Sequence, residues 1–192
     1  MATARQGIYP GSFNPPTKAH LAVAAAALRA HRLDRVDWTV SRRALEKENV
    51  ERPLFEDRIN VLRQIATARD WLGVVVTDRQ LLVDMAEGYD VLILGADKWH
   101  QVLDPRYYGD SESARDDAVA RLPRLAIAPR PPLSVPAEYL LDVDQAYGEM
   151  SSTAARAGAI DLMADEAAAF DRATGAWTDP ERYERWLAER TS

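Results

Sequence analysis

Near its N-terminus the chain reads GIYPGSFNPPTKAH over residues 7–20. A short apolar run, Gly7 to Tyr9, leads into a turn rich in glycine and proline. An Ala-rich stretch, Lys18 to His31, follows, and Thr17 is placed to act as the N-cap of a helix. This stretch therefore predicts a strand, a tight turn and a helix in succession, the first unit of a parallel sheet.

The same alternation continues along the chain. Short apolar runs predict further strands at residues 36–40, 73–77, 90–94, 125–128 and 139–143. Segments of helical periodicity separate them, one starting near Pro53 and one over residues 80–87. Strands that are apolar along their whole length have no solvent side, so helices must cover both faces. We predict an α/β fold with a parallel sheet flanked by helices, whose ligand crevice opens at the carboxyl ends of the strands.

The C-terminal part is predicted to be helical. Residues 154–170 are rich in Ala, Asp and Glu and predict one helix, and a last helix begins near Pro180. An apolar stripe on that last helix is expected to pack on the body, and its members are Tyr183, Trp186 and Leu187. We predict a main domain at residues 1–160 and a helical extension packed on it at residues 161–192.

Composition narrows the functional class. The 192 residues include 24 Lys plus Arg and 30 Asp plus Glu, a net charge of -6. An acidic chain offers no broad surface for nucleic-acid phosphates, so we expect no nucleic-acid partner and expect any anion to be held in a cleft. The chain has no cysteine, which excludes thiolate metal sites, iron–sulfur clusters and cysteine nucleophiles.

Membrane partners are not expected either. Every apolar run is far shorter than the ~20 residues needed to cross a bilayer. Residues 1–7 lack the apolar core of a secretory signal, so we expect a cytoplasmic location. The sequence leaves the oligomeric state open, a homo-oligomer included. Trp71 and Trp99 are expected to fill the core and not to stack on a base.

The turn after the first strand has the features of a phosphate-binding site. The helix that follows it leaves its first backbone N–H groups unpaired, and Gly11 lets a ligand approach the backbone closely. Thr17 and His20 lie three residues apart, so on a helix their side chains share one face. Both can then reach the same anion.

Three other positions carry polar signals. The run Ser151-Ser152-Thr153 opens a helix, and Arg156 one turn later can form a fork on phosphate oxygens. Gly95 and Asp97 follow the strand at residues 90–94, where a carboxylate suits a ribose hydroxyl. Lys47 lies in a charged loop after the strand at residues 36–40. We assign no residue as a metal ligand.

Taken together, these motifs resemble the nucleotidylyltransferases. The first, GSFNP followed by Thr17 and His20, is similar to their H-x-G-H motif in its T-x-x-H form, and residues 151–156 are similar to their I-S-S-T-x-x-R motif. Within that group the chain most resembles the nicotinamide or nicotinate mononucleotide adenylyltransferases. Residues 95–97 are similar to the G-x-D of that family.

The resemblance implies a Rossmann-like fold and a reaction. In that family AMP passes from ATP to the phosphate of a mononucleotide, with magnesium, and a dinucleotide and pyrophosphate are formed. The expected small-molecule partners are therefore ATP and a mononucleotide, and Mg²⁺ is the expected cofactor. The residues to which the resemblance gives a catalytic role are Thr17, His20, Lys47 and Arg156. Those to which it gives a role in binding ATP or substrate are Gly11, Ser12, Phe13, Gly95, Asp97, Ser152 and Thr153.

The sequence also departs from that family. The segment between two predicted strands, residues 78–90, is short. It lacks the S-Y-T-x-D-T-L-like stretch with which the bacterial members of that family hold the pyridine ring. The acceptor is therefore open, and phosphopantetheine or a phosphocholine-like compound is the alternative within enzymes. A nucleotide-binding module without turnover is the alternative outside enzymes.

Overall fold

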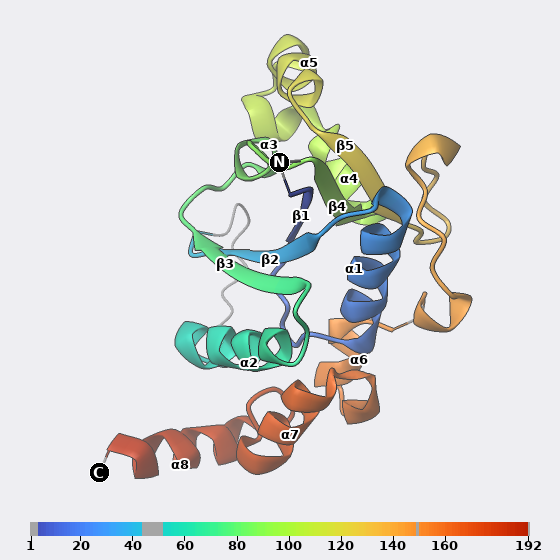
Figure 1. Cartoon of the computed structure of the whole chain (residues 1–192). Helices are drawn as coiled ribbons and strands as arrows, with labels where there is room; N and C mark the ends of the chain where they lie inside the picture. Colours follow the sequence, from blue (N-terminus) through green and yellow to red (C-terminus); the bar gives the residue numbers. More distant parts are fainter. Residues whose placement is uncertain (1–3, 44–51, 149, 192) are drawn as a thin grey trace.

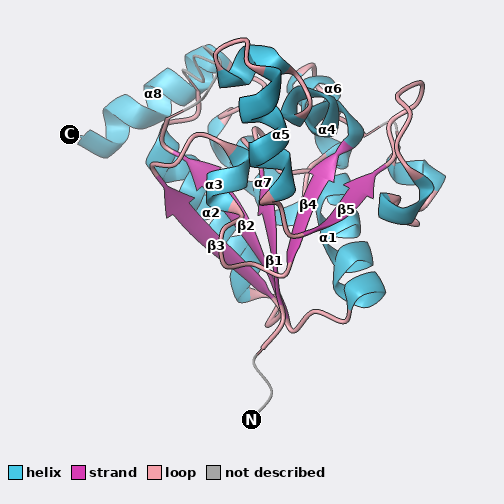
Figure 2. Cartoon of the chain, turned by 90° about the horizontal axis from the view of Figure 1, so that it is seen from above, coloured by secondary structure: helices cyan, strands magenta, loops and turns pink. Residues whose placement is uncertain are grey.

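A twisted five-stranded parallel sheet forms the centre of the molecule (Figure 2). The structure is a computed structural model that describes residues 4–43, 52–148 and 150–191. The strand order is β3-β2-β1-β4-β5, and each neighbouring pair is parallel. The strands are β1 (Gln6–Pro10), β2 (Arg35–Ser41), β3 (Leu72–Thr77), β4 (Val91–Gly95) and β5 (Arg124–Ala128). The predicted α/β fold is confirmed, with a Rossmann-like arrangement.

Helices cover both faces of this sheet. Alternating side chains of one strand enter two separate cores: Val91 and Ile93 join the core under α1 and α2, whereas Leu92 and Leu94 join the core under α3 and α4. The helices are α1 (Lys18–His31), α2 (Phe55–Thr67), α3 (Leu82–Met85), α4 (Ala96–Val102) and α5 (Glu112–Ala120). Trp99 is buried in the second core and Trp71 packs against the first, as expected.

The strand order places a switch point at the centre of the sheet. The chain leaves β1 toward β2 on one side, and β4 returns beside β1 on the other side. In such a sheet a crevice opens where the carboxyl ends of these two strands diverge. Gly11 and Gly95 lie at those two ends.

Two predicted elements were wrong. Residues 139–143 form no strand, because only Leu140 pairs with β5, as an isolated bridge to Ile127, after the 3-10 turn η2 (Ala137–Tyr139). The helix predicted over residues 154–170 is interrupted at Gly158, whose φ of 113° is incompatible with a helix. The observed elements there are α6 (Ser152–Arg156), η4 (Ile160–Leu162) and α7 (Asp165–Thr174).

The last helix, α8 (Pro180–Thr191), follows α7 at the C-terminal end of the chain (Figure 1). It packs on the body through the predicted stripe. Tyr183 is fully buried, and its hydroxyl donates to the buried carboxylate of Asp57 on α2 at 2.6 Å. The guanidinium of Arg190 donates to the same carboxylate at 2.7 Å. A buried carboxylate on α2 thus fixes the C-terminal helix to the body. No helix in the described ranges is long and apolar enough to cross a membrane.

Candidate active site

The turn after β1 is held in place by an aromatic side chain. Phe13 adopts a φ of 45°, in the left-handed region that costs a residue with a Cβ about 1–2 kcal/mol. Its ring is 1% exposed and stacks on Trp38 with centroids 4.7 Å apart, so core packing holds the strained backbone. The N–H of Gly11 donates to the carbonyl of Thr39 at 3.0 Å. Among the described residues the N–H groups of Ser12 and Phe13 have no acceptor, which leaves two donors for an anion.

Thr17 and His20 form a direct pair at the start of α1. The backbone N–H of Thr17, the N-cap residue, donates to Nδ1 of His20 at 2.9 Å, and the Thr17 hydroxyl oxygen lies 2.8 Å from the same nitrogen. A backbone N–H only donates, so Nδ1 must be unprotonated. The neutral ring then carries its proton on Nε2. His20 is therefore a hydrogen-bond donor toward the site, and not a base.

The surroundings of His20 keep it neutral. Burial, with a further contribution from the positive charge of Arg130, lowers the pKa of His20 from 6.5 to about 4. The ring also makes edge contacts with Phe13, at 5.1 Å between centroids, and with Trp38 at 6.4 Å. An imidazole in this setting stabilises negative charge by donating a hydrogen bond, without carrying a charge of its own.

The second motif meets the first turn directly. Ser151 is the N-cap of α6, and its hydroxyl accepts from the N–H of Ala154 at 3.0 Å. The hydroxyl of Ser152 donates to the carbonyl of Pro15 at 2.8 Å. Arg156 donates to the carbonyl of Asn14 and, at 3.3 Å, to the Thr153 hydroxyl. Residues that lie 137 or 142 positions apart in the sequence thus share one edge of the crevice.

These contacts use some hydrogen-bond donors of the second motif and leave others for a ligand. A hydroxyl has one proton, so while Ser152 donates to Pro15 it cannot also donate to a phosphate. Arg156 has five N–H donors, and its side chain is exposed, so it keeps donors for an anion. Thr153 is exposed beside it. Because α6 has only five residues, side chains rather than a long helix dipole supply most of the positive potential here.

The third motif lies at the end of β4. Gly95 is the N-cap of α4, and Asp97 is in the first turn of that helix with an exposed carboxylate. A Cβ at Gly95 would lie 2.6 Å from Oδ1 of Asp97. The glycine therefore leaves the room that this carboxylate orientation needs.

One cavity of about 1590 Å³ brings these motifs together. It lies over the carboxyl ends of β1 and β4, and among the described residues four cationic side chains and three carboxylates line it. The expected site residues that line it are Gly11, Ser12, Phe13, Thr17, His20, Gly95, Asp97, Ser152, Thr153 and Arg156. Lys47, the remaining one, falls outside the described residues. We refer to this space as cavity 1.

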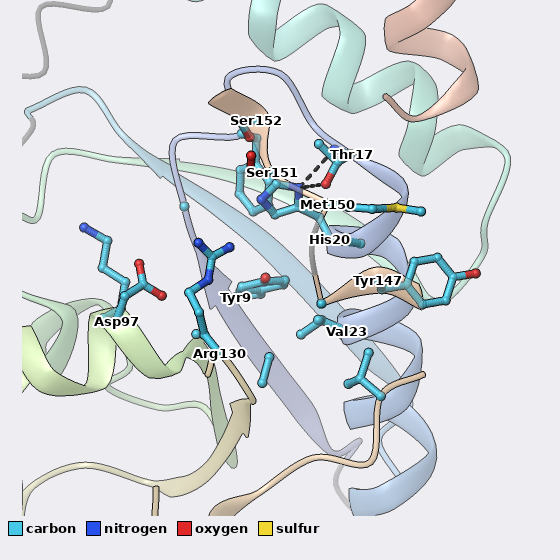
Figure 3. A pocket seen from close by; sticks show the side chains of 18 of the residues that line it. Tyr9, Thr17, His20, Val23, Asp97, Arg130, Tyr147, Met150, Ser151 and Ser152 are labelled. Carbon is cyan, nitrogen blue, oxygen red and sulfur yellow. Dashed lines mark hydrogen bonds between the residues drawn. The ribbon is translucent and has the colours of Figure 1, made fainter. Parts of the chain in front are cut away.

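Sequence reasoning missed two residues at the centre of cavity 1. Figure 3 shows the guanidinium of Arg130 between Asp97 and Tyr9, below the ring of His20. Burial, followed by the negative charge of Asp97, raises the pKa of the Tyr9 phenol above its ordinary value of 10.0, so the phenol stays neutral. Arg130 comes two residues after β5. The rule that ligands bind after strand ends could have found it.

A second, smaller cavity adjoins the first. Cavity 2, of about 370 Å³, lies over the carboxyl ends of β1 and β2. The described residues that it shares with cavity 1 are Pro10, Gly11, Ser12, Lys98 and Gln101. Its cationic lining residues are Arg42, Arg43, Arg58 and Lys98, and no described residue that lines it is acidic. The Arg42 guanidinium lies 4.9 Å from the centroid of the Phe55 ring. Cavity 2 is thus positive and has an aromatic wall.

A Rossmann-like sheet with hydrogen-bond donors gathered at its switch point is typical of nucleotide-binding α/β proteins. The chain belongs to the cytidylyltransferase-like family, whose model matches residues 8–158. That match covers every motif of cavity 1, and it confirms the resemblance to the nucleotidylyltransferases.

Curated relatives narrow the comparison further. A probable nicotinate-nucleotide adenylyltransferase of Methylorubrum extorquens (strain PA1) is 45% identical over 64 residues, which are 33% of this chain and 34% of the relative. One of Caulobacter sp. (strain K31) is 32% identical over 109 residues, 55% of this chain and 50% of the relative. The chain matches a third to a half of the length of these relatives.

Proposed function

We propose that this chain transfers AMP from ATP to the phosphate of nicotinate or nicotinamide mononucleotide and releases pyrophosphate. The observation that carries the proposal is that His20 at the start of α1 and Arg156 at the end of α6 line one cavity together with Arg130. The name of the two relatives, nicotinate-nucleotide adenylyltransferase, supports this acceptor.

The reaction needs positioning more than proton transfer. An oxygen of the acceptor phosphate attacks the α-phosphorus of ATP, a new P–O bond forms, and the bond to the β-phosphate breaks. The acceptor phosphate has a second pKa of about 6, so it is already largely dianionic near neutral pH and needs no general base. Negative charge develops on the departing pyrophosphate, where fixed donors lower the barrier.

The donors that cavity 1 offers suit this task. Nε2–H of His20, the N–H groups of Ser12 and Phe13 and the remaining donors of Arg156 would hold the triphosphate, with Arg130 across from them. Asp97 would accept hydrogen bonds from the ribose of the adenosine. Lys47 is proposed as a further triphosphate ligand from the sequence motif alone.

Magnesium would enter with ATP. Within the ranges that the structure describes, no three His, Asp or Glu side chains are grouped as a metal site. Mg²⁺ on nucleotides is commonly held by phosphate oxygens, waters and one or two carboxylates. Asp142 and Asp144 line cavity 1 as well as Asp97, so carboxylates other than the proposed ribose ligand are present for a metal that arrives bound to the substrate.

Cavity 2 is the proposed acceptor site. It shares the Gly11–Ser12 backbone with cavity 1, so an acceptor phosphate at the shared wall would face the α-phosphate of ATP. The ring of Phe55 and the guanidinium groups around it suit a planar ring with an anionic substituent. The missing ring-binding stretch at residues 78–90 keeps another phosphate acceptor as the second candidate.

A panel of acceptors tests the proposal. ATP or CTP is mixed with magnesium, protein and one acceptor, and pyrophosphate is measured while the product is identified by mass spectrometry. The acceptors are nicotinate mononucleotide, nicotinamide mononucleotide, phosphopantetheine and phosphocholine. We expect pyrophosphate to be released when ATP is mixed with nicotinate or nicotinamide mononucleotide, and the product to be the corresponding dinucleotide. Turnover with another acceptor alone would establish the second candidate, and ATP binding without any turnover would establish a silent module.

A further inference from the structure

The turn between β1 and α1 is held by the C-terminal segment. The carbonyl of Asn14 accepts from Arg156, that of Pro15 from the Ser152 hydroxyl at 2.8 Å, and that of Pro16 from the N–H of Ala164 at 3.0 Å. Thr17 adds an isolated antiparallel bridge to Met163. Three consecutive carbonyls of the turn therefore take their hydrogen bonds from residues more than 130 positions away.

The side chain of Asn14 is held by a hydrogen bond from Trp177, near the C-terminus. Asn14 is 9% exposed, and its Oδ1 accepts from the indole Nε1–H of Trp177 at 2.7 Å. Trp177 is 7% exposed, so both partners are removed from water. A buried amide oxygen that loses such a donor is left unpaired, which makes this bond expensive to break.

Trp177 is itself fixed by a buried carboxylate. Oδ1 of Asp171 on α7, 1% exposed, accepts from the N–H of Trp177 at 2.7 Å and from that of Thr178 at 3.1 Å. Oδ2 accepts from the Thr178 hydroxyl at 2.6 Å. The Phe170 ring meets the indole edge-on at 5.9 Å. The indole N–H therefore has one fixed direction, toward Asn14.

The turn transmits this constraint to the site. Asn14 is separated from Thr17 by two prolines, which have few backbone conformations available. The N–H of Thr17 in turn fixes Nδ1 of His20. A displacement at Asn14 therefore reaches the imidazole through rigid residues.

We propose that Trp177 is a positioning residue that holds the His20 ring in its donor orientation by way of Asn14 and Thr17. Residues 163–178 then belong to the working site and are not an appendage. The expected effect of Trp177 on turnover rests on the proposed function. The expected effect of Trp177 on the orientation of His20 does not.

A double-mutant cycle on the full chain tests the inference. Trp177→Phe removes the N–H and keeps an aromatic ring, and Asn14→Leu removes the acceptor with a side chain of similar size. Turnover is pyrophosphate release from ATP with nicotinate mononucleotide. Because a small misplacement of a reacting group is costly, we expect each single variant to lower kcat about 10- to 100-fold with little change in KM for ATP. The double variant should be no worse than the poorer single variant.

The cycle also separates positioning from direct contact, because Trp177 lines cavity 1. If its ring bound ATP directly, KM for ATP would rise and the losses of the two variants would multiply, which would overturn the proposal. Trp71→Phe is the matched control, since that indole packs against the first core and does not line cavity 1. It should leave kcat unchanged.

NMR titration of His20 supplies a readout that needs no turnover. In the wild-type protein Nδ1 should stay unprotonated well below pH 6, whereas in Trp177→Phe or Asn14→Leu the pKa of His20 should rise toward its ordinary value. An unchanged titration in a folded variant would contradict the proposal. If Trp177→Phe fails to fold, Asn14→Leu probes the same bond from its other end. Absence of turnover in every protein, with a shifted His20 titration, would reject the proposed function and retain the positioning role.

Discussion

The backbone N–H of Thr17 donates to Nδ1 of His20 across 2.9 Å at the first turn of α1. This single bond determines the chemistry of the ring, because it leaves Nε2 as the protonated nitrogen. Glutamate or glutamine commonly occupies the third helical position to accept from the N-cap backbone. Here a histidine takes that place, so one side chain both caps the helix and presents a donor to cavity 1.

Removal of the His20 ring should slow the chemical step. We expect His20→Ala to raise the activation free energy by more than about 2.7 kcal/mol, or roughly 100-fold in kcat, because a fixed donor to developing charge is lost. His31→Ala on the same helix is the control, since His31 does not line cavity 1. Turnover near that of wild type in a folded His20→Ala protein would reject the role.

The low pKa of His20 should appear as a pH dependence of stability. Between pH 6.5 and about 4 the unfolded chain binds a proton at His20 that the folded chain does not bind, so stability falls as the pH falls through this window. Between pH 7 and pH 4.5 the free energy of unfolding should fall by about 2 kcal/mol more in the wild-type protein than in His20→Gln. Urea unfolding at both pH values measures this, and equal losses in the two proteins would contradict it.

Gly95 should act through the carboxylate of Asp97. An added Cβ would lie 2.6 Å from Oδ1, and the flexible carboxylate should rotate away at little cost in stability. We expect Gly95→Ala to raise KM for ATP about tenfold, as loss of one hydrogen bond to a charged group does, and to leave thermal unfolding unchanged. Asp97→Ala should raise KM for ATP by a similar factor, and the double variant should have no higher KM than Asp97→Ala alone. A further loss in the double variant would show that Gly95 acts independently.

Arg130 should influence both ATP and His20. We expect Arg130→Lys to raise KM for ATP about tenfold because the planar fork is lost. Arg130→Ala should in addition raise the pKa of His20, since a nearby positive charge is removed. Arg124→Lys, at the other end of β5, is the control for the charge-conserving change. An unchanged KM in both Arg130 variants would place the triphosphate elsewhere.

Much of the fold follows from local patterns. The apolar runs at residues 36–40, 73–77, 90–94 and 125–128 became strands to within one residue at either end, because helices on both faces of the sheet favour mostly apolar strands. β2 also buries two polar side chains, Asp37 and Thr39. The run at residues 139–143 has a similar pattern but begins at the last residue of η2 and pairs with β5 at one residue only. Alanine content favoured a continuous helix at residues 154–170, and the single Gly158 outweighed it.

The site was less predictable than the fold. The motifs of α1, α4 and α6 were readable because each follows its own local rule for a helix start, and tertiary structure brought them to one cavity. Arg130 was missed because it is flanked by prolines and belongs to no motif. The bond from Trp177 to Asn14 spans 163 positions, and no local pattern in either segment indicates it.

Nitrogen NMR of His20 during titration with ATP tests the central claim most directly. The chain has three histidines, so the spectrum is simple, and His20→Gln assigns the resonance. We predict that ATP shifts Nε2 of His20 saturably at one equivalent, while Nδ1 keeps the resonance of an unprotonated acceptor and His31 and His100 do not move. Saturation with ATP that leaves Nε2 of His20 unmoved, or no binding of ATP, would contradict the account.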